Sequence, residues 1–236
     1  MRYISAIIVA AGKGKRFTGP LAKPLAKINA LPVIYYSLKT LSGHSQIKEI
    51  VLVVNAGIKD GVARIIKKYR IPKVSGLVIG GRRRQDSVYN GLRAVNERAD
   101  LVLIHDGARP FVGEELITAA IKEAIRYGAA IAGVPVTSTI KKVARSPSRQ
   151  VTSNCLVEKT LDRSGLWEIQ TPQVFRKDLI FRAYERFGNT DVTDDAALVE
   201  KSGSRVKVVM GAYSNIKITT SEDLAQASQI ARCRAK

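Results

Sequence analysis

A glycine-rich, basic segment follows the first apolar run of the chain. Residues 10–16 read Ala-Ala-Gly-Lys-Gly-Lys-Arg, directly after Ile4–Val9, which we predict to be a buried β-strand. Glycine lets a main chain approach an anion closely, and the N–H groups of such a turn can point at that anion. Full positive charges come from Lys13, Lys15, Arg16, Lys23 and Lys27. The segment therefore predicts a polyphosphate site at the end of the first strand.

This loop matches neither of two well-known phosphate-binding motifs. No Gly-Lys-Ser/Thr follows at the Walker A spacing, and Phe17 occupies the third glycine position of the dinucleotide fingerprint. A solvated basic loop is the alternative interpretation of its lysines.

Two further loops carry groups that suit a nucleotide. Residues 80–88 read Gly-Gly-Arg-Arg-Arg-Gln-Asp-Ser-Val, where glycines permit close backbone approach and Ser87 can hydrogen-bond a base or ribose. A helix start with surface arginines is the alternative. Residues 105–110 read His-Asp-Gly-Ala-Arg-Pro. There Asp106 can accept from a ribose hydroxyl or help place a hydrated metal, and Arg109 can bind phosphate through two hydrogen bonds. We interpret His105 as structural, because no Ser or Cys nucleophile pattern accompanies it.

Strand-like and helical patterns alternate along the chain, and each of the three loops follows a predicted strand. Strands are predicted at residues 4–9, 49–54, 76–79, 101–105, 129–136, 205–209 and 216–218, and helices at 32–41, 59–69, 85–96 and 114–127. This order predicts a single α/β domain over residues 1–236, with a Rossmann-like, mostly parallel sheet and helices on both faces. Ligands of such sheets lie outside the carboxyl ends of the strands. Residues 220–223, Thr-Ser-Glu-Asp, predict a capping box that opens a last helix.

The alternation is interrupted between about residues 137 and 163. Two β-type runs, Ile140–Val143 and Val151–Val157, flank a polar segment that contains Pro147, which predicts an inserted β-hairpin arm. Because a lone two-stranded hairpin is marginal in water, we expect the arm to pack on a second subunit.

Composition limits the class of protein. The 236 residues are 45% hydrophobic, which suffices for one sizeable core. The first apolar run is short and leads into Gly-Lys-Gly-Lys-Arg, so we do not interpret it as a signal peptide. No segment approaches the roughly 18 apolar residues of a membrane span. Cys155 and Cys233 lie far apart and form no Cys-x-x-Cys pair, so neither a metal site nor a disulfide framework is indicated, and we expect a reducing, cytoplasmic location.

The formal net charge of +19 raises the possibility of a nucleic-acid partner. Against it, the chain has no concentrated basic tail, only 6% aromatic residues and no RRM, zinc-finger or basic-zipper signature. A helix-turn-helix stays open as the alternative nucleic-acid-binding motif. We therefore expect anionic small-molecule substrates and keep a non-catalytic nucleic-acid binder as the distant alternative.

The ordered motifs of the second half sharpen this interpretation. They are Thr139-Ile140-Lys141, residues 167–173 (Trp-Glu-Ile-Gln-Thr-Pro-Gln), Thr193-Asp194-Asp195-Ala196 and residues 215–219 (Asn-Ile-Lys-Ile-Thr). With the three loops, and over about residues 4–228, the chain resembles the 2-C-methyl-D-erythritol 4-phosphate cytidylyltransferases of the non-mevalonate isoprenoid pathway. The resemblance implies transfer of CMP from CTP to methylerythritol phosphate, with release of pyrophosphate. It also implies Mg²⁺ held mainly by the CTP phosphates, with no dedicated protein metal site, and a homodimer whose arm reaches into the neighbouring active site.

The resemblance also implies a role for each matching residue. Arg16, Lys23 and Lys217 are the catalytic cations, the first two on the CTP phosphates and Lys217 near the reacting α-phosphate. The nucleotide site comprises Ala10, Ala11, Gly12, Gly14, Gly81, Ser87, Asp106 and Gly107, with Asp106 and Gly107 on the ribose side. The sugar-phosphate site comprises Arg109, Thr171 and Thr193, completed by Thr139 and Arg163 from the partner's arm.

Two segments depart from the usual family pattern. Residues 22–24 read Ala-Lys-Pro where the family has Pro-Lys-Gln, and Arg82 stands where the family tends to have an acidic residue. The nearest rival is a ribitol-5-phosphate cytidylyltransferase. The motifs Thr139-Ile140-Lys141 and Thr193-Asp194-Asp195 favour the methylerythritol enzyme.

Overall fold

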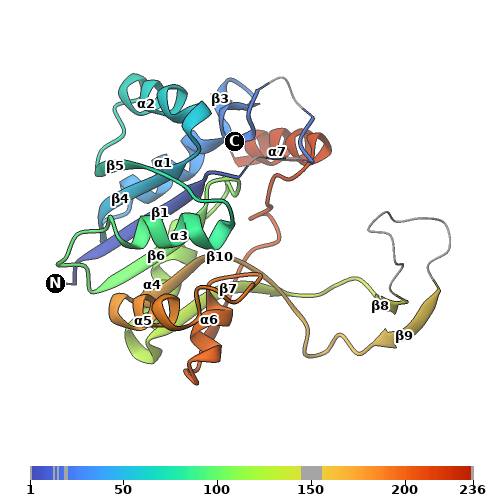
Figure 1. Ribbon diagram of the computed structural model, residues 1–236. Helices are drawn as coiled ribbons and strands as arrows, with labels where there is room; N and C mark the ends of the chain where they lie inside the picture. Colours follow the sequence, from blue (N-terminus) through green and yellow to red (C-terminus); the bar gives the residue numbers. More distant parts are fainter. Residues whose placement is uncertain (1, 13, 15, 19–20, 145–155, 235–236) are drawn as a thin grey trace.

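A central, mostly parallel sheet organises the computed structural model, which describes residues 2–12, 14, 16–18, 21–144 and 156–234 (Figure 1). The described residues form a seven-stranded sheet of order β11-β7-β10-β6-β1-β4-β5, in which only β10 runs antiparallel to its neighbours. Its strands are β1 (Ile4–Ala10), β4 (Ile47–Val54), β5 (Val74–Ile79), β6 (Leu101–Asp106), β7 (Ala129–Pro135), β10 (Trp167–Arg176) and β11 (Lys207–Met210).

Helices cover both faces of this sheet, as predicted. One apolar cluster joins the sheet to α1 (Val33–Gly43), α2 (Lys59–Lys68) and α4 (Glu114–Tyr127). A second cluster, on the opposite face, joins it to α3 (Arg84–Leu92), α5 (Lys177–Phe187) and α6 (Ala196–Lys201). Within β4, Ile50, Leu52 and Val54 belong to the first cluster, and Val51 and Val53 to the second. Burial on both faces explains why the strands are near-continuous apolar runs.

Smaller elements frame the carboxyl-terminal edge of the sheet. The chain between β1 and α1 contains a short 3₁₀ turn and a small two-stranded sheet, against which the last helix packs. The capping box is confirmed: Asp223 Oδ2 accepts from the Thr220 N–H at 2.9 Å, and the Asp223 N–H donates to Thr220 Oγ1 at 3.4 Å. The elements are η1 (Lys23–Leu25), β2 (Lys27–Ile28), β3 (Leu31–Pro32), η2 (Ala56–Ile58) and α7 (Ser221–Arg234).

The predicted strand at residues 216–218 is wrong. This segment is a loop that crosses towards β6, where the Ile218 N–H donates to the Ala108 carbonyl at 2.9 Å and the Ile218 side chain is fully buried. Its apolar residues pack under α7 rather than joining the sheet. Conversely, β10, α5 and α6 had not been predicted, and the helix expected at 85–96 ends at Leu92.

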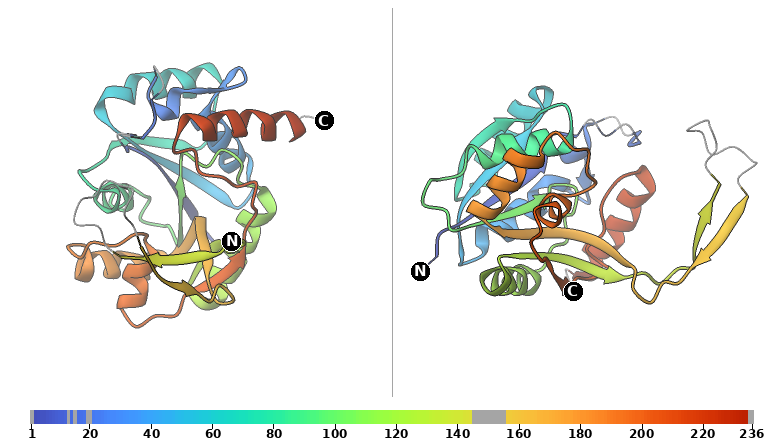
Figure 2. Two further views of the ribbon diagram at one scale, coloured as in Figure 1. Left: turned by 90° about the vertical axis from the view of Figure 1, so that its right-hand side faces the viewer. Right: turned by 60° about the horizontal axis from the view of Figure 1, so that its bottom comes forward.

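The arm is present as a two-stranded sheet that extends away from the body of the molecule (Figures 1 and 2). Strand β8 (Ile140–Val143) pairs antiparallel with β9 (Val157–Leu161), with Ile140 opposite Leu161. Of the predicted second run, Val151–Val157, residues 151–155 lie outside the described residues, and the described strand begins at Val157 and continues to Leu161. Apolar side chains on the arm are exposed, among them Leu156 at 76% and Val157 at 57%.

In the part of the chain that the structure describes, no helix is long and apolar enough to cross a membrane.

Candidate active site

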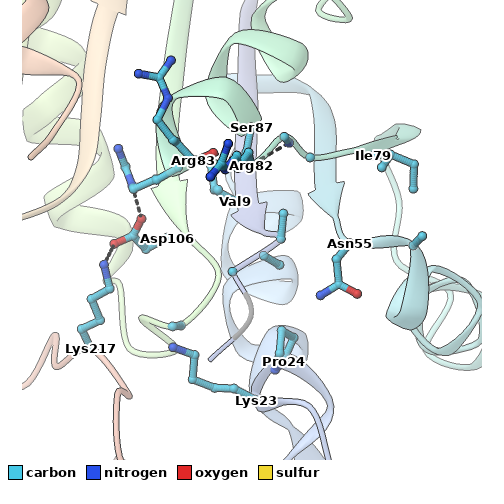
Figure 3. A pocket seen from close by; sticks show the side chains of 18 residues that line it. Val9, Lys23, Pro24, Asn55, Ile79, Arg82, Arg83, Ser87, Asp106 and Lys217 are labelled. Carbon is cyan, nitrogen blue, oxygen red and sulfur yellow. Dashed lines mark hydrogen bonds and ion pairs between the residues drawn. The ribbon is translucent and has the colours of Figure 1, made fainter. Parts of the chain in front are cut away.

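A cavity of about 380 Å³ opens at the carboxyl ends of β1, β4, β5 and β6 (Figure 3). All three loops singled out by sequence contribute to it, as does the loop before α7. The lining residues are Val9, Ala10, Ala11, Gly12, Lys23, Pro24, Asn55, Ala56, Ile79, Gly80, Gly81, Arg82, Arg83, Arg84, Ser87, Asp106, Ala108 and Lys217. The position is the one expected for the ligand of a parallel α/β sheet.

Asp106 lies at the centre of the charged end of this cavity. Its Oδ2 atom accepts from Lys217 Nζ at 2.5 Å, and its Oδ1 atom accepts from Arg84 Nε at 3.2 Å. Although burial opposes ionisation, the charges of Arg84 and Lys217 hold the pKa of Asp106 well below its ordinary value. Asp106 is therefore an ionised hydrogen-bond acceptor at pH 7, and is unsuited to act as a proton donor there.

Lys23 approaches the same end of the cavity from η1. Burial lowers the pKa of Lys23, and the nearby charges of Lys217 and Arg16 lower it further. Each of these effects disfavours a positive charge until an anion arrives to compensate it. The grouping of Lys23 with Lys217, drawn in Figure 3, is thus an arrangement that favours binding of a polyanion.

A closely packed turn at Gly80 and Gly81 forms another wall of the cavity. A Cβ atom on Gly80 would lie 2.3 Å from the Ala11 Cβ, and one on Gly81 would lie 2.3 Å from the Asp86 Cβ. Ser87 Oγ accepts from the Gly81 N–H at 3.0 Å and donates to the Arg83 carbonyl at 3.1 Å. The two glycines are thus required for packing, and Ser87 holds the turn that forms the wall.

His105 lies behind Asp106 and does not line the cavity. Its Nε2 atom donates to the Arg109 carbonyl at 3.0 Å, since a carbonyl can only accept, and its Nδ1 atom accepts from the Thr171 hydroxyl at 3.0 Å. Thr171 Oγ1 also accepts from the Asp106 N–H at 3.0 Å. Burial lowers the pKa of His105 to about 4, so the ring is neutral at pH 7 and orders the end of β6.

We expect His105 to make the protein less stable in mild acid, by about 2 kcal/mol between pH 7 and pH 5. Its folded-state pKa, about 4, lies below the ordinary value of 6.5, so the unfolded chain binds more protons in this window. Urea unfolding of the wild type and His105→Gln at both pH values measures the effect, and the variant should lose less stability. Equal losses in the two chains would assign the dependence to other groups.

The structure does not bring every predicted site residue to the cavity. Arg109 is buried, with Nη1 donating to the Asn215 carbonyl at 2.7 Å and Nη2 to the Ile169 carbonyl at 3.3 Å. A Cβ on Gly107 would lie 2.7 Å from Ile34 Cδ1, so this glycine serves packing. The predicted residues that do not line the cavity are Gly14, Arg16, Gly107, Arg109, Thr139, Arg163, Thr171 and Thr193. Lys13 and Lys15 lie outside the described residues.

Some residues that line the cavity were not predicted from the sequence. Asn55 follows β4 directly and points into the cavity (Figure 3), a position that the carboxyl-end rule for parallel sheets could have identified. Arg84 had been grouped with possible surface arginines, yet it pairs with Asp106 and, at 2.8 Å, with Asp195. Only the fold shows that pairing.

Comparisons with known proteins agree over nearly the whole chain. Residues 4–233 match the family model described as IspD: 2-C-methyl-D-erythritol 4-phosphate cytidylyltransferase. A relative of that name from Alkaliphilus metalliredigens is 45% identical, over 94% of this chain and 90% of its own length. Another from Geobacillus thermodenitrificans is 44% identical, over 97% of each chain. Among solved structures, the 4-diphosphocytidyl-2C-methyl-D-erythritol synthase of Anaerococcus prevotii superimposes with a TM-score of 0.83 at 36% identity, covering 98% of this chain and 96% of its own.

Proposed function

Since the chain belongs to the 2-C-methyl-D-erythritol 4-phosphate cytidylyltransferase (IspD) family, and is thus a CTP-dependent nucleotidyltransferase of isoprenoid biosynthesis, we propose how its cavity transfers CMP from CTP to methylerythritol phosphate. An oxygen of the substrate phosphate attacks the α-phosphorus of CTP. The bond from the α-phosphorus to the bridging oxygen breaks, and pyrophosphate leaves with its electrons. The observation that carries this proposal is the convergence of Lys23, Lys217 and Asp106 in one cavity.

The reaction requires no general base. With a second pKa near 6, the attacking phosphate is largely dianionic at pH 7. The obstacle is to bring two anions together and to stabilise the charge that develops at the α-phosphate, which is a task for positioned cations. In this scheme Lys217 contacts the α-phosphate, and Lys23 and Arg16 contact the β- and γ-phosphates.

The remaining lining residues would hold the nucleoside. Ala10, Ala11, Gly81 and Ser87 form the closely packed wall against which a cytosine would lie. Asp106, ionised and lining the cavity, would accept from a ribose hydroxyl. Gly12, Gly14 and Gly107 would let the main chain approach the nucleotide. We assign Arg82 no contact with the base through its side chain, because the acidic residue usual in the family is replaced by a cation.

We propose that Mg²⁺ is held mainly by the CTP phosphates. Among the described residues, no group of three or more His, Cys, Asp or Glu side chains is placed to hold a metal ion. Asp106 is the one carboxylate among the described residues lining the cavity, and Mg²⁺ commonly takes one or two carboxylates together with substrate phosphates and waters. When bound, the ion neutralises charge on the triphosphate oxygens.

We also propose a homodimer in which the arm of one subunit completes the site of the other. The exposed apolar side chains of Leu156 and Val157 support a packing partner, since a two-stranded hairpin is marginal by itself. Thr139 and Arg163 would come from the arm, and Arg109, Thr171 and Thr193 from the body, to bind methylerythritol phosphate. The two widely separated cysteines of the sequence indicate no disulfide framework, which supports a cytoplasmic location.

The pH dependence of turnover tests the mechanism. We expect kcat/KM for methylerythritol phosphate to fall below about pH 6, where the free substrate phosphate becomes a monoanion. Because that limb belongs to the substrate, it should persist with the same midpoint in the His105→Gln and His44→Gln variants. A limb that disappears with either histidine would assign a general base to the enzyme and would contradict the mechanism.

We expect Arg163→Ala to raise the KM for methylerythritol phosphate more than the KM for CTP. The variant loses a cation that, from the arm, would face the sugar phosphate, and it leaves the nucleotide cavity untouched. Initial rates with each substrate varied in turn give the two constants. Arg64→Ala, an exposed arginine on α2, is the matched control. Equal increases in both KM values would count against an arm-borne contact to the sugar phosphate.

A further inference from the structure

The first turn of α3 ties the nucleotide cavity to the loop that follows α5. Arg83 Nη2 donates to the Gly188 carbonyl at 3.1 Å. Gln85 Nε2 donates to the same carbonyl at 2.6 Å and to the Thr190 carbonyl at 2.9 Å. Residues 81–87 therefore have two roles. Gly81 and Ser87 form a wall of the cavity, and the side chains of Arg83 and Gln85 hold the loop that leads to Thr193.

Between these two contacts, Arg84 places one guanidinium against two carboxylates. Its Nε atom lies 3.2 Å from Asp106 Oδ1, and its Nη1 atom lies 2.8 Å from Asp195 Oδ2. Asp195 is fully buried at the start of α6 and accepts from the Tyr184 hydroxyl at 2.5 Å. A continuous polar chain thus runs from Lys217 through Asp106, Arg84 and Asp195 to Tyr184.

The two oxygens of Asp106 are shared between two cations that differ in exposure and in number of carboxylate partners. The guanidinium of Arg84 faces one carboxylate through Nε and another through Nη1. Burial opposes its positive charge, but Asp195 and Asp106 raise its pKa. Lys217 pairs with Asp106 alone among the described residues; its side chain is 42% exposed and lines the cavity. Without Arg84, the carboxylate of Asp106 would have Lys217 as its one ion-pair partner among the described residues, and the ammonium would be bound there more tightly.

We propose that Arg84 is a positioning residue for cytidylyl transfer. By neutralising and orienting Asp106 from the Oδ1 side, it leaves the ammonium of Lys217 available to the reacting phosphate. A lysine at this position could not take the role, because one ammonium cannot span two carboxylates in the manner of a planar guanidinium. The inference rests on the function proposed above for Asp106 and Lys217.

A purely structural role for Arg84 makes different predictions. In that case the residue would serve only to neutralise buried Asp195, whose isolated charge would be strongly destabilising. Loss of Arg84 would then loosen the loop that carries Thr193 and raise the KM for methylerythritol phosphate. Removing the charge of Asp195 at the same time would restore both stability and activity.

The decisive comparison is therefore between Asp195→Asn and the double variant Arg84→Met with Asp195→Asn. Both lack the buried charge at position 195, so their melting temperatures should be similar, and in Asp195→Asn the amide oxygen at this position can still accept from Arg84. We expect kcat of the double variant to be about tenfold or more below that of Asp195→Asn, because small misplacements of reacting groups have effects of this size or larger. The KM for methylerythritol phosphate should be nearly the same in the two variants. Equal kcat values would overturn the positioning role.

Arg84→Lys provides a second measurement that does not depend on the double variant. It keeps a positive charge beside Asp195, and we expect it to fold but to keep a lowered kcat. Full recovery of kcat by lysine would show that bridging of the two carboxylates is unnecessary. If the wild-type chain itself releases no pyrophosphate from CTP and methylerythritol phosphate, the proposed function fails and the inference fails with it. If the wild type is active, the variants test Arg84 alone.

Discussion

Lys217→Ala should lower kcat on the order of 10²–10³-fold, the usual effect of removing a preorganised stabiliser of developing charge. Lys217 Nζ lies 2.5 Å from Asp106 Oδ2, on a side chain that comes from the loop before α7 and points into the cavity (Figure 3). In the mechanism it leaves this ion pair to contact the α-phosphate as the new bond forms. Since that contact strengthens in the transition state, the loss should appear in kcat more than in the KM for CTP.

The measurement is steady-state pyrophosphate release at saturating CTP and methylerythritol phosphate. Lys122→Ala, an exposed lysine on α4, is the matched control for loss of one charge. Because Asp106 keeps Arg84 as a partner, the variant should fold, which its circular dichroism spectrum and melting temperature establish. Near-normal turnover in Lys217→Ala would refute the assigned role.

Lys23→Ala should also lower kcat on the order of 10²–10³-fold, and it should raise the KM for CTP as well. Burial and the neighbouring cations Lys217 and Arg16 lower the pKa of Lys23 in the free enzyme. The negative charge of a bound triphosphate would offset these effects and stabilise the protonated form. A contact to the β- and γ-phosphates is made in the ground state and strengthens as charge moves onto the departing pyrophosphate in the transition state. The effect should therefore divide between KM and kcat, in contrast to Lys217.

Initial rates over a range of CTP concentrations separate the two parameters. Lys39→Ala, an exposed lysine on α1, controls for the change in net charge. A Lys23→Ala enzyme with an unchanged KM for CTP would contradict a contact to the triphosphate, even if its kcat were low.

Local patterns predicted the framework of the fold because each strand carries its own signal. The runs that became β1, β4 and β6 are apolar on both faces and are followed by glycine or polar loops, so both their existence and their edge could be inferred. The antiparallel strand β10 was missed because its residues Gln170, Thr171 and Gln173 are polar yet buried by partners distant in sequence. The segment at 216–218 has a strand-like composition, but tertiary packing of Ile218 under α7 decides its conformation.

The candidate site was predictable only as far as single loops allow. Glycines and cations after strands indicated Lys23, Ser87 and Asp106, each of which the structure brings to the cavity. Whether an arginine side chain is exposed or buried cannot be predicted from its neighbours in sequence. Among the three consecutive arginines at residues 82–84, Arg84 lies between carboxylates from β6 and the start of α6. Arg109, from another loop, is buried and donates to backbone carbonyls. These environments depend on contacts between segments more than 20 residues apart.

The most direct test of the account compares two sugar phosphates in a coupled pyrophosphate-release assay with CTP. We predict release with methylerythritol phosphate, and a kcat/KM for ribitol 5-phosphate that is lower by about tenfold or more, since discrimination reflects contacts to the substrate in the transition state. A higher kcat/KM with ribitol 5-phosphate, or no pyrophosphate with either acceptor, would contradict the claim that this cavity transfers CMP to methylerythritol phosphate.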